Sequence, residues 1–487
     1  MSLFAVKPLA SILGDAEKES LRRTLGPGQL VALGIGAIIG AGLFSLTGIA
    51  AAEHAGPAVV YSMIFAAIGC AFAGICYSEF STMIPIAGSA YTYSYATMGE
   101  FMAWIIGWDL VLEYAVGAST VAVSWSKYLV SLLKDFGITF PAQFAASRFE
   151  PITLPGTKIV INGTINLPAL FIVILISLLL IVGIKESARV NAVIVVIKVS
   201  VVIIFIILGW AYINPANHTP FIPPNTGEVG TFGWTGIFRG AGVVFFAFIG
   251  FDAVSTAAQE TKKPQRDMPI GIIGSLAVCT ILYVLFSYVL TGIVNYKELN
   301  DAAPVALAVD RTAYTWLKPA LKFAIIMGYT SVILVMLLGQ SRVFFSMSRD
   351  RLLPKVFSDI HPKFRTPWRS NLLFMVFTGV FAAFAPISAL GEMTSIGTLF
   401  AFVLVCIAIM IMRKTHPELH RPFRTPMVPL IPILGIGFNL WMMYFLGWTN
   451  WARLMGWMAI GMIVYFMYSR KHSTVQIAEN AASKVVR

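Results

Sequence analysis

Two glycine-interrupted stretches inside long apolar runs carry the backbone groups most able to bind a small charged molecule. The first covers residues 34–44 (GIGAIIGAGLF) and the second covers residues 245–255 (FFAFIGFDAVS). Glycine loosens a helix, and unwound backbone at membrane depth is tolerated only where protein or a cavity surrounds it. Each stretch is therefore predicted to unwind locally and to free main-chain N–H and C=O groups.

Freed main-chain groups at these interruptions would match the two charges of an α-amino acid. The N–H groups of residues 40–42 would lie at the positive end of the following half-helix, which suits a carboxylate. Carbonyl groups suit an ammonium, and those expected to be free belong to Ile38, Ile39, Phe246, Ala247 and Ile249. The alternative is close helix packing through small residues. Two symmetrically placed interruptions favour binding.

Two aromatic residues flank the second interruption. Phe246 and Phe251 both lie where a ring can close over a bound molecule, and Phe246 is the stronger candidate for such a gate because it adjoins the break. The alternative is ordinary aromatic packing, since the chain has 35 Phe residues.

One lysine lies deep inside an apolar run. Lys198 is about eight residues into the run that starts at Asn191, which is roughly 12 Å at the helical rise. A charge at that depth is costly and marks a functional candidate. We expect its amine to face the freed carbonyls of the first interruption and to couple proton binding to transport. The alternative is a side chain that snorkels to the interface.

Three acidic residues also fall within apolar runs. Asp109 and Glu113 are one helical turn apart and share a helix face. Asp252 follows the second interruption, where it is either the N-cap of the next half-helix or a proton carrier near Glu113. Glu79, near the end of its run, is expected at the membrane interface.

The elements that must position these residues are membrane-spanning helices. The chain has 487 residues, of which 57% are hydrophobic and 12% charged, with a mean hydropathy of +0.79. Apolar runs of about 20 residues, long enough to cross a bilayer, recur along its whole length. The sequence predicts an all-α membrane protein with twelve transmembrane helices, near residues 29–50, 57–83, 98–132, 166–184, 190–213, 233–258, 269–294, 320–346, 370–388, 394–412, 427–447 and 453–469.

The distribution of basic residues predicts the orientation. Most of the 35 Lys and Arg residues fall in the tails and in the loops on the same side as the tails. This positive-inside bias places both termini in the cytoplasm of a multi-pass cell-membrane protein. The net charge of +12 is therefore expected to meet anionic membrane lipid, especially at 342–369 and 413–424, and not nucleic acid.

The two interruptions divide the chain into matching halves. Five spans run from each interruption to the end of its half, and an odd number of spans gives the halves opposite orientation. Two inverted repeats, about 29–213 and 233–413, form a ten-helix core at 26–413. The remainder is a cytoplasmic tail at 1–25, helices eleven and twelve at 414–470, and a cytoplasmic tail at 471–487. Such repeats rock against each other around a midplane site in secondary transporters.

Residues suited to catalysis or metal binding are not grouped in this sequence. The six His residues fall in predicted loops or tails, and neither HExxH nor a phosphate-binding loop is present. Cys70, Cys76, Cys279 and Cys406 lie in apolar runs without ligand spacing, so they are interpreted as small buried hydrophobic residues. The prediction is a protein that is not an enzyme and has no cofactor or metal.

Several motifs in order resemble those of a known group of proteins. They are residues 34–44, 85–93 (PIAGSAYTY), 250–255 (GFDAVS) and 348–354 (SRDRLLP). The sequence resembles the amino acid–polyamine–organocation superfamily, and within it the bacterial branch of the cationic amino acid transporter family. The resemblance extends over about residues 22–470.

This resemblance implies a leucine-transporter-type fold, with two inverted five-helix repeats plus two extra helices, and proton-dependent amino acid uptake without sodium. By motif, it implies a proton-coupling role for Glu113, Lys198 and Asp252. The substrate-binding residues that it implies are Ile38, Ala41, Gly42, Phe246, Ala247, Ile249 and Met336. Many relatives carry Thr or Ser where this chain has Ala41, so a hydroxyl contact is lost there while the backbone amide remains.

The leading hypothesis is a secondary active amino acid transporter that works by alternating access, with amino acid, protons and membrane lipid as its partners. An exchanger of amino acids or polyamines is the nearest alternative. A passive channel or facilitator is a further alternative, against which the discrete interruptions and the buried lysine argue. The sequence predicts neither the preferred amino acid nor the oligomeric state.

Overall fold

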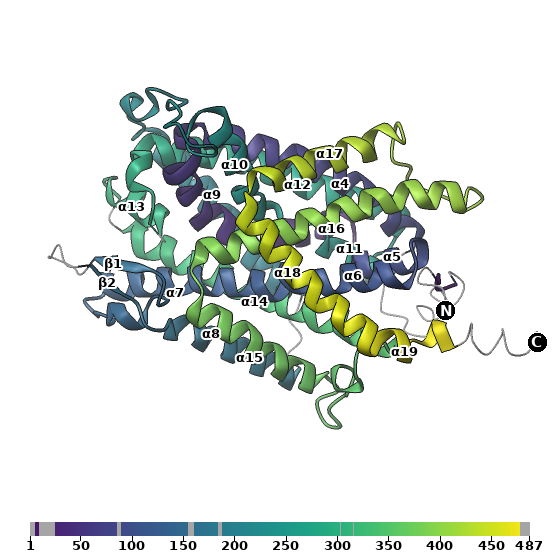
Figure 1. Ribbon diagram of the computed structural model, residues 1–487. Coiled ribbons are helices and arrows are strands. Elements are labelled where there is room, and N and C mark those ends of the chain that lie inside the picture. The colour runs from purple at the N-terminus through teal and green to yellow at the C-terminus, as the bar shows by residue number, and fades with distance from the viewer. Residues whose placement is uncertain are drawn as a thin grey trace, which may run out of the picture.

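The computed structural model describes residues 5–8, 25–84, 89–153, 160–183, 188–301, 303–314 and 316–477. Long helices packed side by side make up nearly all of this part of the chain, so the predicted helical class is confirmed (Figure 1). Most of the two predicted tails lies outside the described residues, as do residues 85–88 of the 85–93 motif.

The first half of the chain contains helices interrupted at several points. In order, its elements are α2 (Pro27–Ile38), η1 (Gly42–Leu46), α3 (Thr47–Ala50), η2 (Ala51–Ala55), η3 (Gly56–Ala58), α4 (Val59–Met83), α5 (Ser89–Thr97), α6 (Glu100–Val111), η4 (Leu112–Val116), α7 (Gly117–Asp135), η5 (Ala142–Phe144), β1 (Pro151–Thr153), β2 (Val160–Asn162), α8 (Leu167–Val182) and α9 (Ala188–Trp210).

The second half begins with a loop and a broken helix. In order, its elements are η6 (Pro215–His218), α10 (Gly233–Val244), η7 (Phe245–Phe248), α11 (Ala253–Thr256), η8 (Ala258–Glu260), α12 (Pro264–Ile293), η9 (Tyr296–Glu298), α13 (Pro304–Asp310), α14 (Leu317–Arg349), η10 (Lys355–Phe357), α15 (Trp368–Phe384), α16 (Ile387–Thr415), α17 (Leu430–Phe445), α18 (Trp448–Val464), η11 (Tyr465–Ser469) and α19 (Arg470–His472).

Six helical stretches of the described chain are long and apolar enough to cross a membrane, and a seventh is the pair formed by α17 and α18–α19, which bends by 111°. Four further apolar helices, α2, α8, α10 and α15, are shorter than 18 residues. Two of them end at the glycine interruptions, which is why the spans that contain the interruptions do not qualify whole. The structure thus has several membrane-spanning helices, and the count of twelve stays a prediction.

The helices pack as two groups. In one, α12 lies against both α2 and α4, and α10 also packs on α4. In the other, α14 packs along α7, and α15 packs along α8. The two interruptions belong to the first group. Helix α9 contacts α2 and α12 of the first group as well as α14 of the second, so its side chains lie between the groups.

Large apolar side chains cover much of the outer surface. Phe171, Val196, Val376 and Met467 are all more than half exposed, and they belong to α8, α9, α15 and η11. A soluble protein seldom presents such an extensive apolar surface, whereas a bilayer requires it. The buried interior, by contrast, contains all four cysteines, and none of them forms a disulfide.

The connection between α7 and α8 is one of the two longest in the described chain. It contains one 3₁₀ turn (η5) and an antiparallel hairpin, in which Pro151 pairs with Asn162. The other long connection, between α12 and α14, contains the short helices η9 and α13. Strand pairing in the first connection arises between residues far apart in the segment, so local helix propensity does not reveal it.

The described parts of both tails meet at one end of the helices (Figure 1). Asp350, at the end of α14, accepts a hydrogen bond from Lys7 at 2.9 Å and another from Tyr91 at 2.7 Å. Its backbone carbonyl also accepts from the N–H of Thr474. Burial raises the pKa of Tyr91 well above its usual value, so this hydroxyl remains a donor to Asp350 at neutral pH.

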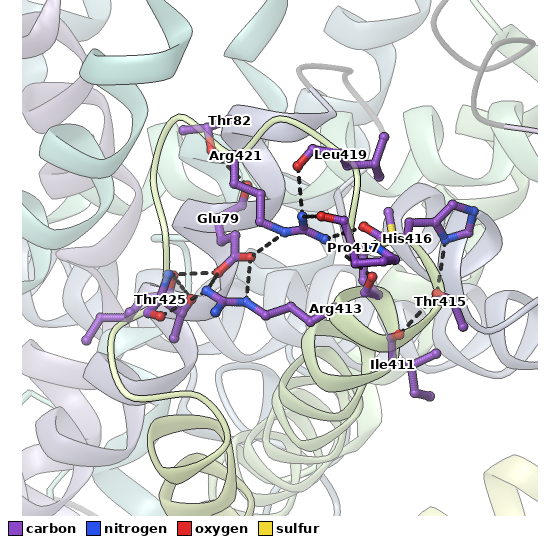
Figure 2. Close-up of polar contacts among 12 residues, drawn as sticks. Glu79, Thr82, Ile411, Arg413, Thr415, His416, Pro417, Leu419, Arg421 and Thr425 are labelled. Atoms are coloured by element: carbon purple, nitrogen blue, oxygen red, sulfur yellow. Dashed lines mark hydrogen bonds and ion pairs between the residues drawn. The ribbon is translucent and has the colours of Figure 1, made fainter.

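Glu79 anchors a long loop at the same end of the helices (Figure 2). The sequence predicts this residue at the membrane interface, and in the structure its side chain, near the end of α4, is fully buried by protein. Arg413 donates two hydrogen bonds to its carboxylate, at 3.1 and 2.8 Å, and Arg421 lies 3.3 Å away. The N–H of Thr425 donates a further bond at 2.7 Å. Two cations and an amide stabilise the buried charge, and they fix the 416–429 loop to α4.

Candidate functional site

The first interruption begins where α2 ends at Ile38. Ile39 leaves the helix with an extended backbone (φ −70°, ψ 108°), and the chain resumes as a wide helical turn at Gly42. The carbonyl of Gly40 accepts from the N–H groups of Leu43 and Phe44, which makes it the first acceptor of the new half-helix. Ile38 and Ala41, both predicted to bind substrate, are buried here.

The second interruption follows α10. One 3₁₀ turn, η7, separates Val244 from the extended residue Ile249 (φ −62°, ψ 136°). Gly250 then adopts φ 117°, a conformation that side chains strongly disfavour. Helix α11 starts only after Asp252. Phe246 and Ala247 lie in the 3₁₀ turn and are buried, together with Ile249.

The two interruptions are in direct contact. A Cβ placed on Gly42 would lie 2.2 Å from the Cα of Ala247, and one placed on Gly250 would lie 2.9 Å from the carbonyl carbon of Ala37. Only residues without a side chain permit this approach. The structure therefore brings together six of the predicted binding residues, Ile38, Ala41, Gly42, Phe246, Ala247 and Ile249, from segments about 200 positions apart.

A tyrosine that the sequence analysis did not single out bridges the two breaks. The hydroxyl of Tyr283, on α12, lies 3.0 Å from the carbonyl oxygens of both Ile38 and Ala247. These two carbonyls were expected to be free for an ammonium, and the tyrosine occupies both instead. A polar hydroxyl midway along an apolar span was the available signal.

The main-chain N–H groups at the first break remain open. Within the described residues, the N–H groups of Gly40, Ala41 and Gly42 have no hydrogen-bond acceptor. Buried main-chain donors are seldom left unpaired, because the loss of hydration costs about as much as a hydrogen bond. Three such donors at the start of one half-helix form a cradle suited to an anionic group.

Lys198 reaches the first interruption from α9. Its Nζ donates to the carbonyl oxygen of Gly36 at 2.8 Å, and its side chain is only 2% exposed. The residue therefore does not snorkel to the interface. Gly328, on α14, leaves space for the stem, since a Cβ there would lie 2.9 Å from the Cε of Lys198. Sequence reasoning missed Gly328 because one glycine in a long span has no local signature.

The three intramembrane acids lie in the same interior. Asp109, Glu113 and Asp252 are each at most 1% exposed, and the carboxyl groups of Glu113 and Asp252 are close enough to interact. Tyr114 donates to Asp252 at 2.8 Å. Asp252 occupies the N-cap position of α11, but its side chain does not cap the helix.

Met336 lies on α14, one helical turn after Val332. Val332 packs against the first interruption, since its side chain would lie 3.5 Å from a Cβ placed on Gly40. Its sulfur is 3.3 Å from a Cβ placed on Gly117 of α7. Met336 therefore lies between α7 and the first interruption. Phe251, the weaker gate candidate, packs edge-on against Tyr77 and is part of the core.

The comparisons with known proteins agree on one family. A family model described as amino acid permease matches residues 25–468. The chain belongs to the amino acid permease family. The permease is 44% identical over 472 residues to the methylthioribose transporter of Bacillus subtilis, an alignment that covers 97% of this chain and 99% of the relative.

Two other similar proteins are named for amino acids. The permease is 44% identical over 477 residues to the branched-chain amino acid permease BcaP of Bacillus subtilis, covering 97% of this chain and 98% of the relative. It is 36% identical over 407 residues to the vacuolar cationic amino acid transporter 4 of Arabidopsis thaliana, an alignment that covers 82% of this chain and 64% of the relative. The resemblance seen in the sequence is confirmed, and the permease is a multi-pass membrane protein whose relatives are transporters and not enzymes.

Proposed function

We propose that this permease takes up α-amino acids by secondary active transport coupled to protons. The observation that carries the proposal is the set of three unpaired N–H groups at Gly40, Ala41 and Gly42, opposite the second interruption. A carboxylate would accept from these donors at the positive end of the half-helix. An anionic ligand would supply the acceptors that these three neighbouring main-chain donors lack in an apolar interior.

The ammonium of the substrate would bind on the opposite side of the carboxylate. The carbonyl of Ile249 is the available acceptor of the second interruption, whereas that of Phe246 already accepts from the N–H of Ile249 at 3.3 Å. The carbonyls of Ala247 and Ile38 would be reached when Tyr283 shifts. The ring of Phe246 would cover the bound substrate, and Met336 would limit the length of its side chain. This arrangement favours small or medium neutral amino acids over arginine, because none of these residues carries a negative charge.

The coupling step would use Lys198, with Glu113 and Asp252 as further proton carriers. A protonated Lys198 ties α9 to Gly36, and loss of the proton would weaken that tie. A proton gradient drives accumulation only if proton affinity differs between outward- and inward-facing states. The position of α9, between the two groups of helices, supports this role.

The proposed architecture is the leucine-transporter-type fold. It has twelve spans, with inverted repeats near 29–213 and 233–413 and both termini in the cytoplasm of the cell membrane. The two interruptions, in contact at the centre of the described helices, support this arrangement. Alternating access would move the group that contains α2 and α10 relative to the group that contains α7 and α14.

One relative favours a second candidate substrate. Methylthioribose is a neutral thio-sugar without carboxylate or ammonium, so it would leave the cradle at residues 40–42 without a charged partner. An exchange mechanism is the nearest alternative mode of transport.

Uptake into proteoliposomes separates these candidates. The assay uses radiolabelled valine with an inward proton gradient and competition by alanine, arginine, isobutylamine, isovalerate and methylthioribose. We expect valine to accumulate, isobutylamine and isovalerate to compete poorly because each lacks one charge, and arginine to compete less than alanine. Strong competition by methylthioribose but not by amino acids would contradict the proposed substrate, and uptake only into vesicles preloaded with amino acid would indicate exchange.

A further inference from the structure

A basic cavity lies at the end of the helices where the described parts of both tails meet. It has a volume of about 200 Å³, whereas one water needs only ~10–15 Å³ by the same kind of measure. Arg351 and Lys355 line it from the segment after α14, and Tyr468, Lys471 and His472 line it from η11 and α19. These elements lie far from the two interruptions, so the cavity is separate from the proposed amino acid site.

The charges in this cavity are uncompensated. Within the described chain, none of Arg351, Lys355 and Lys471 has an acidic group at ion-pair distance, whereas Lys7, at the same end of the helices, pairs with Asp350. No acidic residue lines the cavity. Three cations around one hollow repel one another, and an anion bound between them would relieve that repulsion.

The two walls of the cavity are fixed relative to each other. Arg351 adopts φ 60°, a left-handed conformation that is uncommon outside glycine and that persists only where the surroundings impose it. Its N–H donates to the carbonyl of Ser348, and the next carbonyl, of Leu352, accepts from the hydroxyl of Ser469 at 2.6 Å. On the other wall, the rings of Tyr468 and His472 stack with centroids 4.2 Å apart. Contacts on both walls thus hold the backbone that carries Arg351 in a conformation that it would rarely adopt alone.

Exposed apolar side chains accompany the cavity, one in its lining and others in the helix that supplies Tyr468. Ile477 lies at its rim, and Met467, one residue before Tyr468, is 70% exposed. Ile463, one turn earlier, is also exposed. Ile463 and Met467 are four residues apart at the junction of α18 and η11, so they lie on the same side of this helix. A ligand that fills the cavity would therefore have its charged end among cations and its remainder against lipid-facing side chains.

We propose that this cavity binds the phosphodiester headgroup of an anionic phospholipid in the leaflet next to the two tails. Arg351, Lys355 and Lys471 contact the phosphate oxygens, and the acyl chains lie along Ile463 and Met467. The charge excludes zwitterionic headgroups as equal ligands, since each brings its own cation. The apolar flank distinguishes a lipid from a free phosphate, which has nothing to place against it. The bound lipid joins the end of α14 to α19 and so stabilises the contact between them.

The test uses the delipidated full-length permease in detergent and native mass spectrometry. Dioleoyl phosphatidylglycerol or dioleoyl phosphatidylcholine is titrated into the wild-type protein, into the triple variant Arg351→Gln, Lys355→Gln, Lys471→Gln, and into Lys414→Gln. Lys414 is the matched control, because it is exposed at the same end of the helices, at the end of α16, and does not line the cavity.

We expect phosphatidylglycerol to bind the wild-type and Lys414→Gln proteins equally. The triple variant should bind it at least tenfold more weakly, since each basic residue near an anionic headgroup contributes roughly fivefold. Phosphatidylcholine should bind all of the proteins weakly and alike. Lys471→Gln alone, at an exposed position, should lose about fivefold and serves if the triple variant does not fold.

Two results would overturn the proposal. Equal phosphatidylglycerol binding by the wild-type protein and by Lys471→Gln or the triple variant would show that these cations do not hold a headgroup. Displacement of phosphatidylglycerol by an equal concentration of glycerol 3-phosphate would show that the cavity selects a soluble phosphate and not a lipid.

Discussion

The single methyl group that Gly42 lacks decides whether the two interruptions can meet. A Cβ there would lie 2.2 Å from the Cα and 2.4 Å from the N of Ala247, and these are backbone atoms that a rotamer change cannot move. The amide of Gly42 is also one of three donors proposed to hold the substrate carboxylate. The same position therefore controls both the shape and the chemistry of the site.

We predict that Gly42→Ala weakens amino acid binding at least tenfold, because the methyl group pushes the two breaks apart. Scintillation proximity binding of radiolabelled valine measures this. The matched control is Gly28→Ala in the preceding helix α2, where a Cβ would have nothing within 4 Å. That control should bind normally. Normal binding by Gly42→Ala would show that the close contact is not needed.

Residues at the site differ in how far the sequence could predict them. The glycine interruptions predicted where the helices break, because glycine within an apolar run favours local unwinding. Ile38, Ala41, Gly42, Phe246, Ala247 and Ile249 all lie at these breaks. Tyr283 and Gly328 could not be predicted, since each acts on a segment far away along the chain and only the packing of α12 and α14 brings it there.

Among the elements, the 416–429 loop shows most clearly how one buried charge can fix a segment (Figure 2). Glu79 is contacted by Arg413 at the end of α16, and by Arg421 and the backbone N–H of Thr425 in the loop. Glu79 was expected at the interface because it lies near the end of its span. The partners that bury it are more than 300 positions away along the chain, so no local pattern revealed them.

We predict that Glu79→Ala lowers the stability of the permease by about 3–5 kcal/mol, the usual cost of leaving buried cations without their partner. Glu79→Gln should cost less, since an amide still accepts a hydrogen bond. Thermal unfolding in detergent, followed by intrinsic fluorescence, measures the difference. Glu418→Gln, at an exposed position in the same loop, is the control and should unfold like the wild type. Equal unfolding of Glu79→Ala and the control would contradict the anchor.

For the whole molecule, the helical membrane class followed from composition and hydropathy, whereas the arrangement of helices did not. The sequence predicted where spans lie, and helices such as α12 and α14 match predicted spans to within a few residues. It did not predict that α17 and α18 form a sharply bent pair or that a hairpin joins α7 to α8. Those features depend on contacts between segments rather than on hydrophobic periodicity.

The proposed orientation has a direct test, because all four native cysteines are buried and should not react. Single cysteines placed at Asn300 and at Lys363 report opposite ends of the molecule. In intact cells, a membrane-impermeant maleimide should label Asn300→Cys and should label Lys363→Cys only after permeabilisation. Labelling in the reverse pattern would place both termini outside the cell.

The central claim is that a proton gradient drives amino acid uptake through Lys198. The measurement is valine uptake into proteoliposomes with and without an inward proton gradient, for the wild type, Lys198→Ala, Lys198→Arg and the control Lys134→Ala, which changes an exposed lysine. Wild type and control should accumulate valine above its external concentration only with the gradient. Both Lys198 variants should bind valine yet fail to accumulate it, since alanine carries no proton and a guanidinium does not release one. Undiminished gradient-driven accumulation by Lys198→Ala would contradict the account and transfer the coupling role to Glu113 and Asp252.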